Sequence, residues 1–142
     1  METPEKEFTI SDLFEELKAG KFSAEDPRKT FLYLLNWEIT LASHDPEPEY
    51  FGDQARGIPE GLGVMIYGQW ELYVGEWHKG KRHGKGFMVY SLYQRYAGDW
   101  VDDQRDGYGI TTFRKPSSWT FLDGAWKGQY VDDRWEGEDD VE

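Results

Sequence analysis

The chain of 142 residues contains no cysteine. Disulfides, thiolate metal sites and cysteine nucleophiles are therefore excluded. The N-terminus has no basic segment followed by an apolar run, so no secretory signal is evident. The uncharged apolar stretch at residues 30–37 is far shorter than the roughly 20 residues that cross a bilayer. From these absences we expect a soluble, cytoplasmic protein.

Basic residues are scarce compared with acidic ones. The chain has 16 lysines and arginines against 28 aspartates and glutamates, which gives a formal net charge of −12. A negative field repels phosphate backbones and anionic lipid surfaces. We therefore expect no nucleic-acid partner, and at most a peripheral contact with membranes.

Aromatic residues, in contrast, are abundant. They make up 17% of the chain, with 7 tryptophans, and there are 16 glycines. The mean hydropathy is nevertheless −0.80. This combination favours a thin sheet whose faces are filled by rings over a thick aliphatic core.

One short motif recurs along the second part of the chain. Tyr73, Gly75 and Trp77 alternate with other residues, and Tyr96, Gly98 and Trp100 repeat the pattern 23 positions later. In each of four copies, a second glycine follows the motif glycine after nine positions: Gly52 and Gly61, Gly75 and Gly84, Gly98 and Gly107, Gly128 and Gly137. A fixed period of this length indicates a supersecondary unit that stacks on its neighbours.

These residues resemble the MORN repeat (membrane occupation and recognition nexus), an aromatic-x-Gly-x-aromatic motif followed by a turn and Gly-x-Gly. The resemblance covers roughly residues 50–139. Copy one has Gln54 in place of an aromatic residue, and copy four reverses the ring order as Trp126 and Tyr130, with Asp139 in place of its second glycine. The wider spacing between copies three and four predicts a loop around residues 114–119.

The resemblance implies a mainly β fold with N-terminal helices (α+β), in which stacked antiparallel hairpins form one extended, twisted sheet. It also implies an interaction scaffold. The expected division is an N-terminal helical segment and linker, 1–49, followed by four repeats and an acidic tail within 50–142. The repeats span about 50–72, 73–95, 96–125 and 126–139.

The N-terminal segment predicts two helices. Ser11 is a candidate N-cap for a helix through Ala19, and Gly20 is a natural stop. Asp26-Pro27 begins a second helix, which runs to about Ala42 and has a broad apolar surface.

Period-two alternation divides the repeat residues between two faces. Rings and glycines share one face, such as Tyr73, Gly75 and Trp77. The other face becomes less apolar from the first copy to the last. We therefore expect both helices to dock over copies one and two, on Phe51, Leu62, Val64, Ile66, Val74, Phe87 and Val89.

The side chains that could support chemistry favour no enzyme. There is neither a Ser-His-Asp grouping in context nor a phosphate-binding glycine loop that opens a helix. Asp99, Asp102, Asp103 and Asp106 do not match a calcium loop, and turn aspartates commonly bond to their own backbone. We expect no catalytic residue, no cofactor and no metal.

A basic cluster interrupts the acidic trend in the turn of copy two. His78 and His83 lie there among the cations Lys79, Lys81, Arg82 and Lys85. The simplest interpretation is a solvated hairpin turn, and the alternative is a site for a small anion or an acidic partner.

The aromatic–glycine face is the main candidate for a binding site. We expect its rings to be partly exposed and to receive a peptide or helix of another protein. Stacking that only holds the array together is the alternative. The candidate contact residues are Tyr73, Trp77, Tyr90, Tyr96, Trp100, Trp126 and Tyr130.

The leading hypothesis is therefore a non-catalytic protein-interaction module. A second is a small acidic inhibitory or immunity-type protein that blocks a basic enzyme surface and binds less tightly in salt. A module that associates with phospholipid is a third hypothesis. A fourth is an accessory domain of an enzyme such as a methyltransferase, because the repeat also occurs beside catalytic domains.

Overall fold

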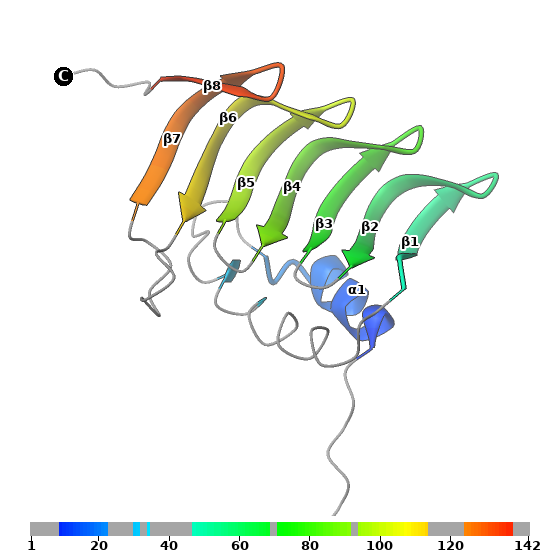
Figure 1. Ribbon diagram of the computed structural model, residues 1–142. Helices are drawn as coiled ribbons and strands as arrows, with labels where there is room; N and C mark the ends of the chain where they lie inside the picture. Colours follow the sequence, from blue (N-terminus) through cyan, green and yellow to red (C-terminus); the bar gives the residue numbers. More distant parts are fainter. Residues whose placement is uncertain are drawn as a thin grey trace, which may run out of the picture.

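Eight strands form one antiparallel sheet in the order of the chain (Figure 1). The computed structural model describes residues 9–22, 30–31, 34, 47–68, 71–91, 94–113 and 124–137. The expected loop at 114–119 lies outside them. The strands are β1 (Glu49–Ala55), β2 (Ile58–Gly68), β3 (Glu71–His78), β4 (Lys81–Ser91), β5 (Gln94–Val101), β6 (Gln104–Phe113), β7 (Gly124–Val131) and β8 (Arg134–Gly137).

Two-residue turns close the four hairpins β1–β2, β3–β4, β5–β6 and β7–β8. Both residues of every turn have positive φ, for example 47° at Asp102 and 72° at Asp103. This is the backbone of a type I′ turn, which matches the twist of the flanking strands. Glycine and aspartate fill the second turn position because they tolerate the left-handed region.

A bulge interrupts each of the first three hairpins at the same place. Gly75 lies opposite Gly86, but Trp77 lies opposite Arg82, so β4 gains two residues relative to β3. An even gain leaves the alternation of faces intact. The bulge contains Gly84, which has a φ of 79°. In the first three copies, the gap of nine residues thus separates a paired glycine from a bulge glycine.

The first predicted helix is present as α1 (Ile10–Lys18), but its N-cap was wrongly assigned to Ser11. Thr9 is the cap, with its hydroxyl accepting the Asp12 amide at 3.3 Å. The Asp12 carboxylate in turn accepts the Thr9 amide at 3.0 Å. Only a cap at Thr9 places an acidic side chain three residues later, where it can complete this reciprocal pair. Gly20, with a φ of 75°, follows the end of the helix.

The second predicted helix, residues 26–42, lies almost entirely outside the described residues. Within it the structure describes Thr30, Phe31 and Leu34, and all three are buried. Phe31 packs edge-on against Phe87, with ring centroids 6.3 Å apart. These three residues thus contribute to the core, whereas a second helix remains a prediction.

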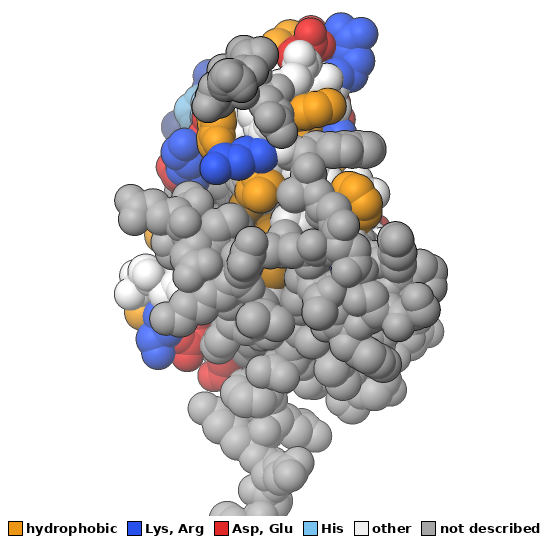
Figure 2. Space-filling model, turned by 90° about the vertical axis from the view of Figure 1, so that its left-hand side faces the viewer, with side chains coloured by type: hydrophobic (Ala, Val, Ile, Leu, Met, Phe, Trp, Pro, Cys, Tyr) orange, Lys and Arg blue, Asp and Glu red, His pale blue; other side chains and the backbone are white. Residues whose placement is uncertain are grey.

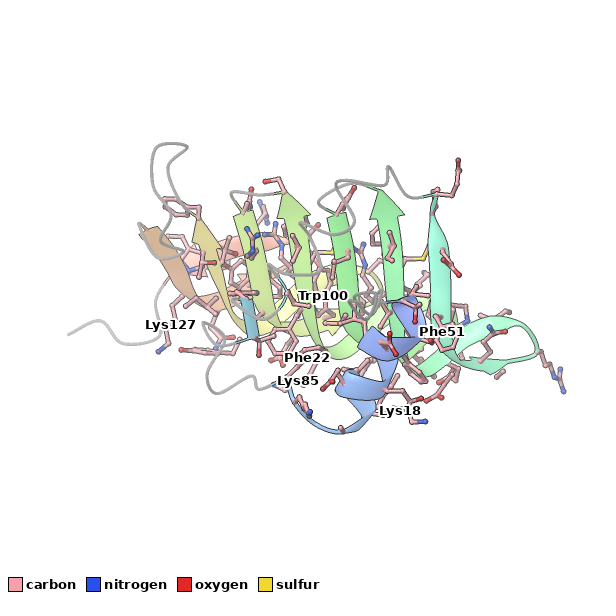
Figure 3. All side chains as sticks on the ribbon, turned by 90° about the horizontal axis from the view of Figure 1, so that it is seen from below. Lys18, Phe22, Phe51, Lys85, Trp100 and Lys127 are labelled. Carbon is pink, nitrogen blue, oxygen red and sulfur yellow. The ribbon has the colours of Figure 1, made fainter. Side chains whose placement is uncertain are left out.

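The sheet has a hydrophobic cluster on each side. On the side called here the helix face, α1 packs over β1, β2 and β3 (Figure 3). Its residues Leu13 and Phe14 belong to the cluster on this side. This confirms that α1 docks on copies one and two. The strand residues of this cluster are Val64, Ile66, Leu72, Val74, Phe87, Val89 and Ala97, with Leu62 and Ile110 at its margin.

The opposite side, called here the aromatic face, carries the rings of the motif. Its buried cluster contains Tyr73, Trp77, Met88, Tyr96, Trp100 and Tyr130, with Tyr50, Met65, Tyr67 and Tyr90 partly buried around it. Rings and aliphatic residues are therefore divided as the period of two predicts.

A candidate binding face built from rings and glycines

In the first three copies of the motif, the first ring lies flat over a glycine of the return strand. The Tyr73 hydroxyl donates to the Glu76 carbonyl at 2.8 Å, which fixes the ring across the sheet. A Cβ on Gly86 would lie 2.1 Å from that hydroxyl oxygen, so no larger residue fits. Tyr50 over Gly63 and Tyr96 over Gly109 repeat this arrangement. The second glycine of Gly-x-Gly is thus required by the tyrosine.

The second ring of the motif ties each hairpin to the one before it. Trp77 Nε1 donates to the Gly63 carbonyl at 3.2 Å, and Trp100 Nε1 donates to the Gly86 carbonyl at 3.3 Å. Buried indole N–H groups need such an acceptor. The tyrosine of the motif therefore makes a hydrogen bond within its own hairpin, and the tryptophan makes one to the preceding hairpin.

Together these rings form a continuous ladder across the four hairpins. Edge-to-face contacts join Tyr50, Trp77, Tyr73, Trp100, Tyr96 and Tyr130 in that order, with centroid separations of 5.1–5.5 Å. Such pairs contribute about 0.5–1.5 kcal/mol each beyond the burial of area. The ladder makes the face rigid along its length.

The acidic residue within the motif stabilises the bulge, a role that sequence reasoning missed. Glu76 Oε2 accepts the backbone amide of Lys85 at 2.8 Å. Asp53 and Asp99 accept the amides of Leu62 and Tyr108 in the same way. The signal was present, because each of the first three copies has an aspartate or glutamate directly after the motif glycine.

The fourth hairpin follows the others with its ring order reversed. Tyr130 lies opposite Gly107, as Trp100 lies opposite Gly84, so it occupies the tryptophan position. Its hydroxyl shares a 2.6 Å hydrogen bond with Thr111 Oγ1. The backbone of Trp126 pairs with Thr111, and its side chain lies outside the described part of the structure.

The expectation that these rings are partly exposed is wrong for most of them. Tyr73 and Tyr96 are fully buried, and Trp77, Trp100 and Tyr130 expose 6%, 2% and 1% of their surface. Tyr73 and Tyr96 are covered because they lie over glycines, and all five rings pack against one another. Tyr90 is the one predicted contact residue that is described and remains partly exposed.

Two arginines complete the aromatic face, in a role that no sequence pattern indicated. Arg82 lies over the Trp100 ring at 4.8 Å and near Tyr67 at 5.8 Å. Arg105 lies near Tyr90, Tyr96 and Tyr130 at 5.4–5.7 Å. Each arginine side chain is one-fifth exposed and reaches from its own hairpin to the next. Cation–π contacts of this kind stabilise by roughly 0.5–2 kcal/mol.

The turn aspartates hold these arginines, which corrects the expectation that they bond to their own backbone. Asp103 Oδ1 accepts the Arg82 amide at 2.8 Å and Arg82 Nε at 3.0 Å. Asp133 accepts the same two groups of Arg105, each at 2.9 Å. A turn carboxylate thus binds the arginine of the preceding hairpin, because the turns of neighbouring hairpins lie side by side.

Burial raises the pKa of the tyrosines on this face. It raises the pKa of Tyr90 to about 12, although Arg105 opposes the shift. It also raises the pKa of Tyr50 to about 12, with the Asp53 carboxylate adding to the effect. The pKa values of Tyr67, Tyr73, Tyr96 and Tyr130 are raised as well, mainly by burial.

The structure does not bring the four cations of the basic cluster together. Arg82 faces the rings, whereas Lys85 projects from the helix face and pairs with Asp99 (Figure 3). Lys79 and Lys81 lie at the tip of the hairpin. Figure 2 shows basic and hydrophobic side chains interspersed on the upper part of the view.

The two histidines line a shallow pocket between the tips of the first two hairpins. His78 Nδ1 lies 2.9 Å from Glu60 Oε2. The pKa of Glu60 is lowered, first by a hydrogen bond from the backbone amide of Lys79 and then by the hydrogen bond with His78. His83 lies beside Asp102 at 3.7 Å, and the two imidazole centroids are 5.4 Å apart. Within the described ranges, no three histidine or carboxylate groups are placed to hold a metal.

Across the described part of the chain, no helix is both long enough and apolar enough to cross a bilayer.

Comparison with known proteins agrees with this geometry. The profile of the MORN repeat matches residues 50–71, 73–91 and 96–115, which are the first three hairpins. No curated protein sequence matched the chain. MORN repeats are commonly protein- or membrane-binding repeats and form a non-enzymatic module. With three matched repeats and a fourth hairpin added in register, this chain is a MORN-repeat protein.

Proposed function

We propose that the repeat sheet is a non-catalytic module that holds a partner protein along its aromatic face. The observation that carries this proposal is the rigid ring ladder, whose buried members support an outer row of partly exposed side chains. This outer row consists of Tyr50, Met65, Tyr67 and Tyr90. Large aromatic side chains held in fixed positions lose little entropy on binding and make effective anchors.

The predicted contact residues take different parts in this binding face. Tyr90 contacts the partner directly. The buried rings do not contact the partner but hold the outer row in position and orientation. They are Tyr73, Trp77, Tyr96, Trp100 and Tyr130. Trp126 is proposed as a contact from its place in the motif alone.

Site-specific photo-cross-linking tests this proposal. A photoreactive phenylalanine at position 90 should capture a partner from the native cell, whereas the same residue at position 108 should not. Tyr108 is a matched control because it is 38% exposed and lies on the helix face. Tyr90→Ala should then weaken the captured complex by about 2 kcal/mol. Equal capture from both positions, or capture from position 108 alone, would contradict the proposal.

A second candidate, an acidic inhibitory protein, is favoured by one observation on the helix face. The carboxylates Asp53, Glu76 and Asp99 lie there in successive hairpins, in a chain whose net charge is −12. Capture of a basic partner from position 108, with affinity that falls steeply as salt rises, would favour this function.

Direct membrane binding is the third candidate, and we expect it to be weak. Each cation near an anionic surface contributes about 1 kcal/mol. Arg82 and Lys85 are already paired with aspartates. Co-sedimentation with acidic liposomes at physiological salt should therefore be low. Strong co-sedimentation that disappears when Lys79, Lys81, Arg82 and Lys85 are neutralised would instead establish a membrane function.

A further inference from the structure

The outer part of the aromatic face carries a tyrosine–arginine pair that occurs twice. Tyr67 of β2 lies beside Arg82 of β4, and Tyr90 of β4 lies beside Arg105 of β6. Both tyrosines and both arginines recur after 23 residues, so the two pairs are related by one step of the repeat. Each pair also joins two neighbouring hairpins.

Both pairs have hydrogen-bond donors that the described part of the protein does not satisfy. Within that part, the Tyr67 and Tyr90 hydroxyls make no hydrogen bond to another residue, and a tyrosine hydroxyl is protonated at neutral pH. Arg82 directs Nε and Nη2 to Asp103, whereas Nη1 faces only the Met88 sulfur at 3.8 Å. A thioether is a weak acceptor. The face therefore suits a ligand rich in exposed carbonyl oxygens.

The spacing of the two pairs selects the conformation of such a ligand. Neighbouring strands are about 4.8 Å apart, so one hairpin step is about 9.6 Å. A polyproline II helix advances about 9.3 Å in one turn of three residues. A β-strand repeats its face after about 6.7 Å. Of these two extended forms, the polyproline II helix presents equivalent residues to successive hairpins.

We propose that the aromatic face binds a polyproline II segment of the partner, running across the strands. Every third residue of this segment packs on a tyrosine ring, first at Tyr67 and then at Tyr90. A polyproline II helix has no internal hydrogen bonds, so its carbonyl groups are open to the tyrosine hydroxyls and guanidinium groups. Aromatic-lined surfaces bind proline-rich segments through the same low-entropy conformation. This inference rests on the proposed function and specifies its ligand.

Two blocked decapeptides, decaproline and a glycine–serine repeat, provide the test. Decaproline should bind saturably to the full chain in an isothermal or NMR titration, and it should shift the Nε–H signals of Arg82 and Arg105. The glycine–serine peptide should do neither. If decaproline fails to bind at millimolar concentration, or if both peptides bind equally, the proposal is overturned.

Four variants locate the binding site. Tyr67→Phe and Tyr90→Phe remove only the hydroxyls and should weaken decaproline binding several-fold. Tyr90→Ala should weaken it by about tenfold or more, whereas Tyr108→Ala, on the helix face, should leave it unchanged. Urea unfolding of each variant separates loss of binding from loss of fold. A folded Tyr90→Ala variant with unchanged affinity overturns the proposal.

Cross-linking from position 90 separates this inference from the proposed function. If a partner is captured there through a helical segment and decaproline does not bind, the interaction module stands and the polyproline II ligand is wrong. If the captured peptide contains a proline-rich stretch, both are supported.

Discussion

Arg82 of the second hairpin forms hydrogen bonds with Asp103 in the turn of the third, a contact called here a clasp. Its Nε donates to the Asp103 carboxylate at 3.0 Å, and its Nη2 donates to the Asp103 carbonyl at 3.1 Å. The same residue lies over Trp100, so one side chain joins the turn, the ring ladder and its own strand. Arg105 and Asp133 form the next clasp, again between neighbouring hairpins.

Loss of this clasp should destabilise the array moderately. Asp103→Asn keeps a residue that tolerates positive φ but removes the charge, and we expect a loss of about 1 kcal/mol, since the pair is partly exposed. Asp102→Asn, in the same turn, is the control and should change stability by less than about 0.5 kcal/mol. Urea unfolding measures both. A control variant that loses as much as Asp103→Asn would argue against the clasp.

The glycine beneath each tyrosine should be intolerant of any side chain. Gly86→Ala places a methyl group 2.1 Å from the Tyr73 hydroxyl oxygen, so the ring must leave its position. We expect a loss of about 3 kcal/mol or more in the free energy of unfolding. Gly68→Ala is the matched control because no atom lies within 4 Å of its added Cβ. Similar unfolding midpoints for the two variants would show that the ring is free to move.

Removal of residues 1–45 should expose the apolar helix face and cause aggregation. Leu13 is fully buried against the strands, and Leu13→Ala should cost about 2–5 kcal/mol within the intact chain. Glu15→Ala, on the exposed side of α1, is the control. Light scattering and thermal melting measure the outcomes. A monomeric 46–142 fragment that melts cooperatively would mean that the repeats need no cap.

Alkaline pH should unfold the protein through its tyrosines. Burial raises the pKa of Tyr50 and Tyr90 to about 12, above the unfolded value of about 10. A raised folded pKa favours the protonated form, so its stabilisation is complete below pH ~10 and is lost between about pH 10 and 12. Absorbance at the tyrosinate band and circular dichroism, followed together, should change in one transition for the buried rings. Titration of all 9 tyrosines near pH 10 in a folded protein would contradict this.

The sequence alone determined the hairpins, their order and the two faces of the sheet. These depend on local signals: glycines at fixed spacing permit bulges and close ring packing, and a period of two assigns side chains to faces. The N-cap of α1 could not be identified from residue type, because threonine and serine are both common caps. The reciprocal hydrogen bonds with Asp12 select Thr9 over Ser11.

Only the tertiary structure decided which rings are covered and which charges are paired. Arg82 meets Asp103 across 21 residues, and Arg105 meets Asp133 across 28, since the wider spacing before the fourth copy changes the interval. Contacts of this kind form when hairpins stack, and no local preference encodes them. The same stacking lays each tyrosine over a glycine and against the next tryptophan. It thereby turns an expected exposed strip into a buried ladder with a narrow accessible row.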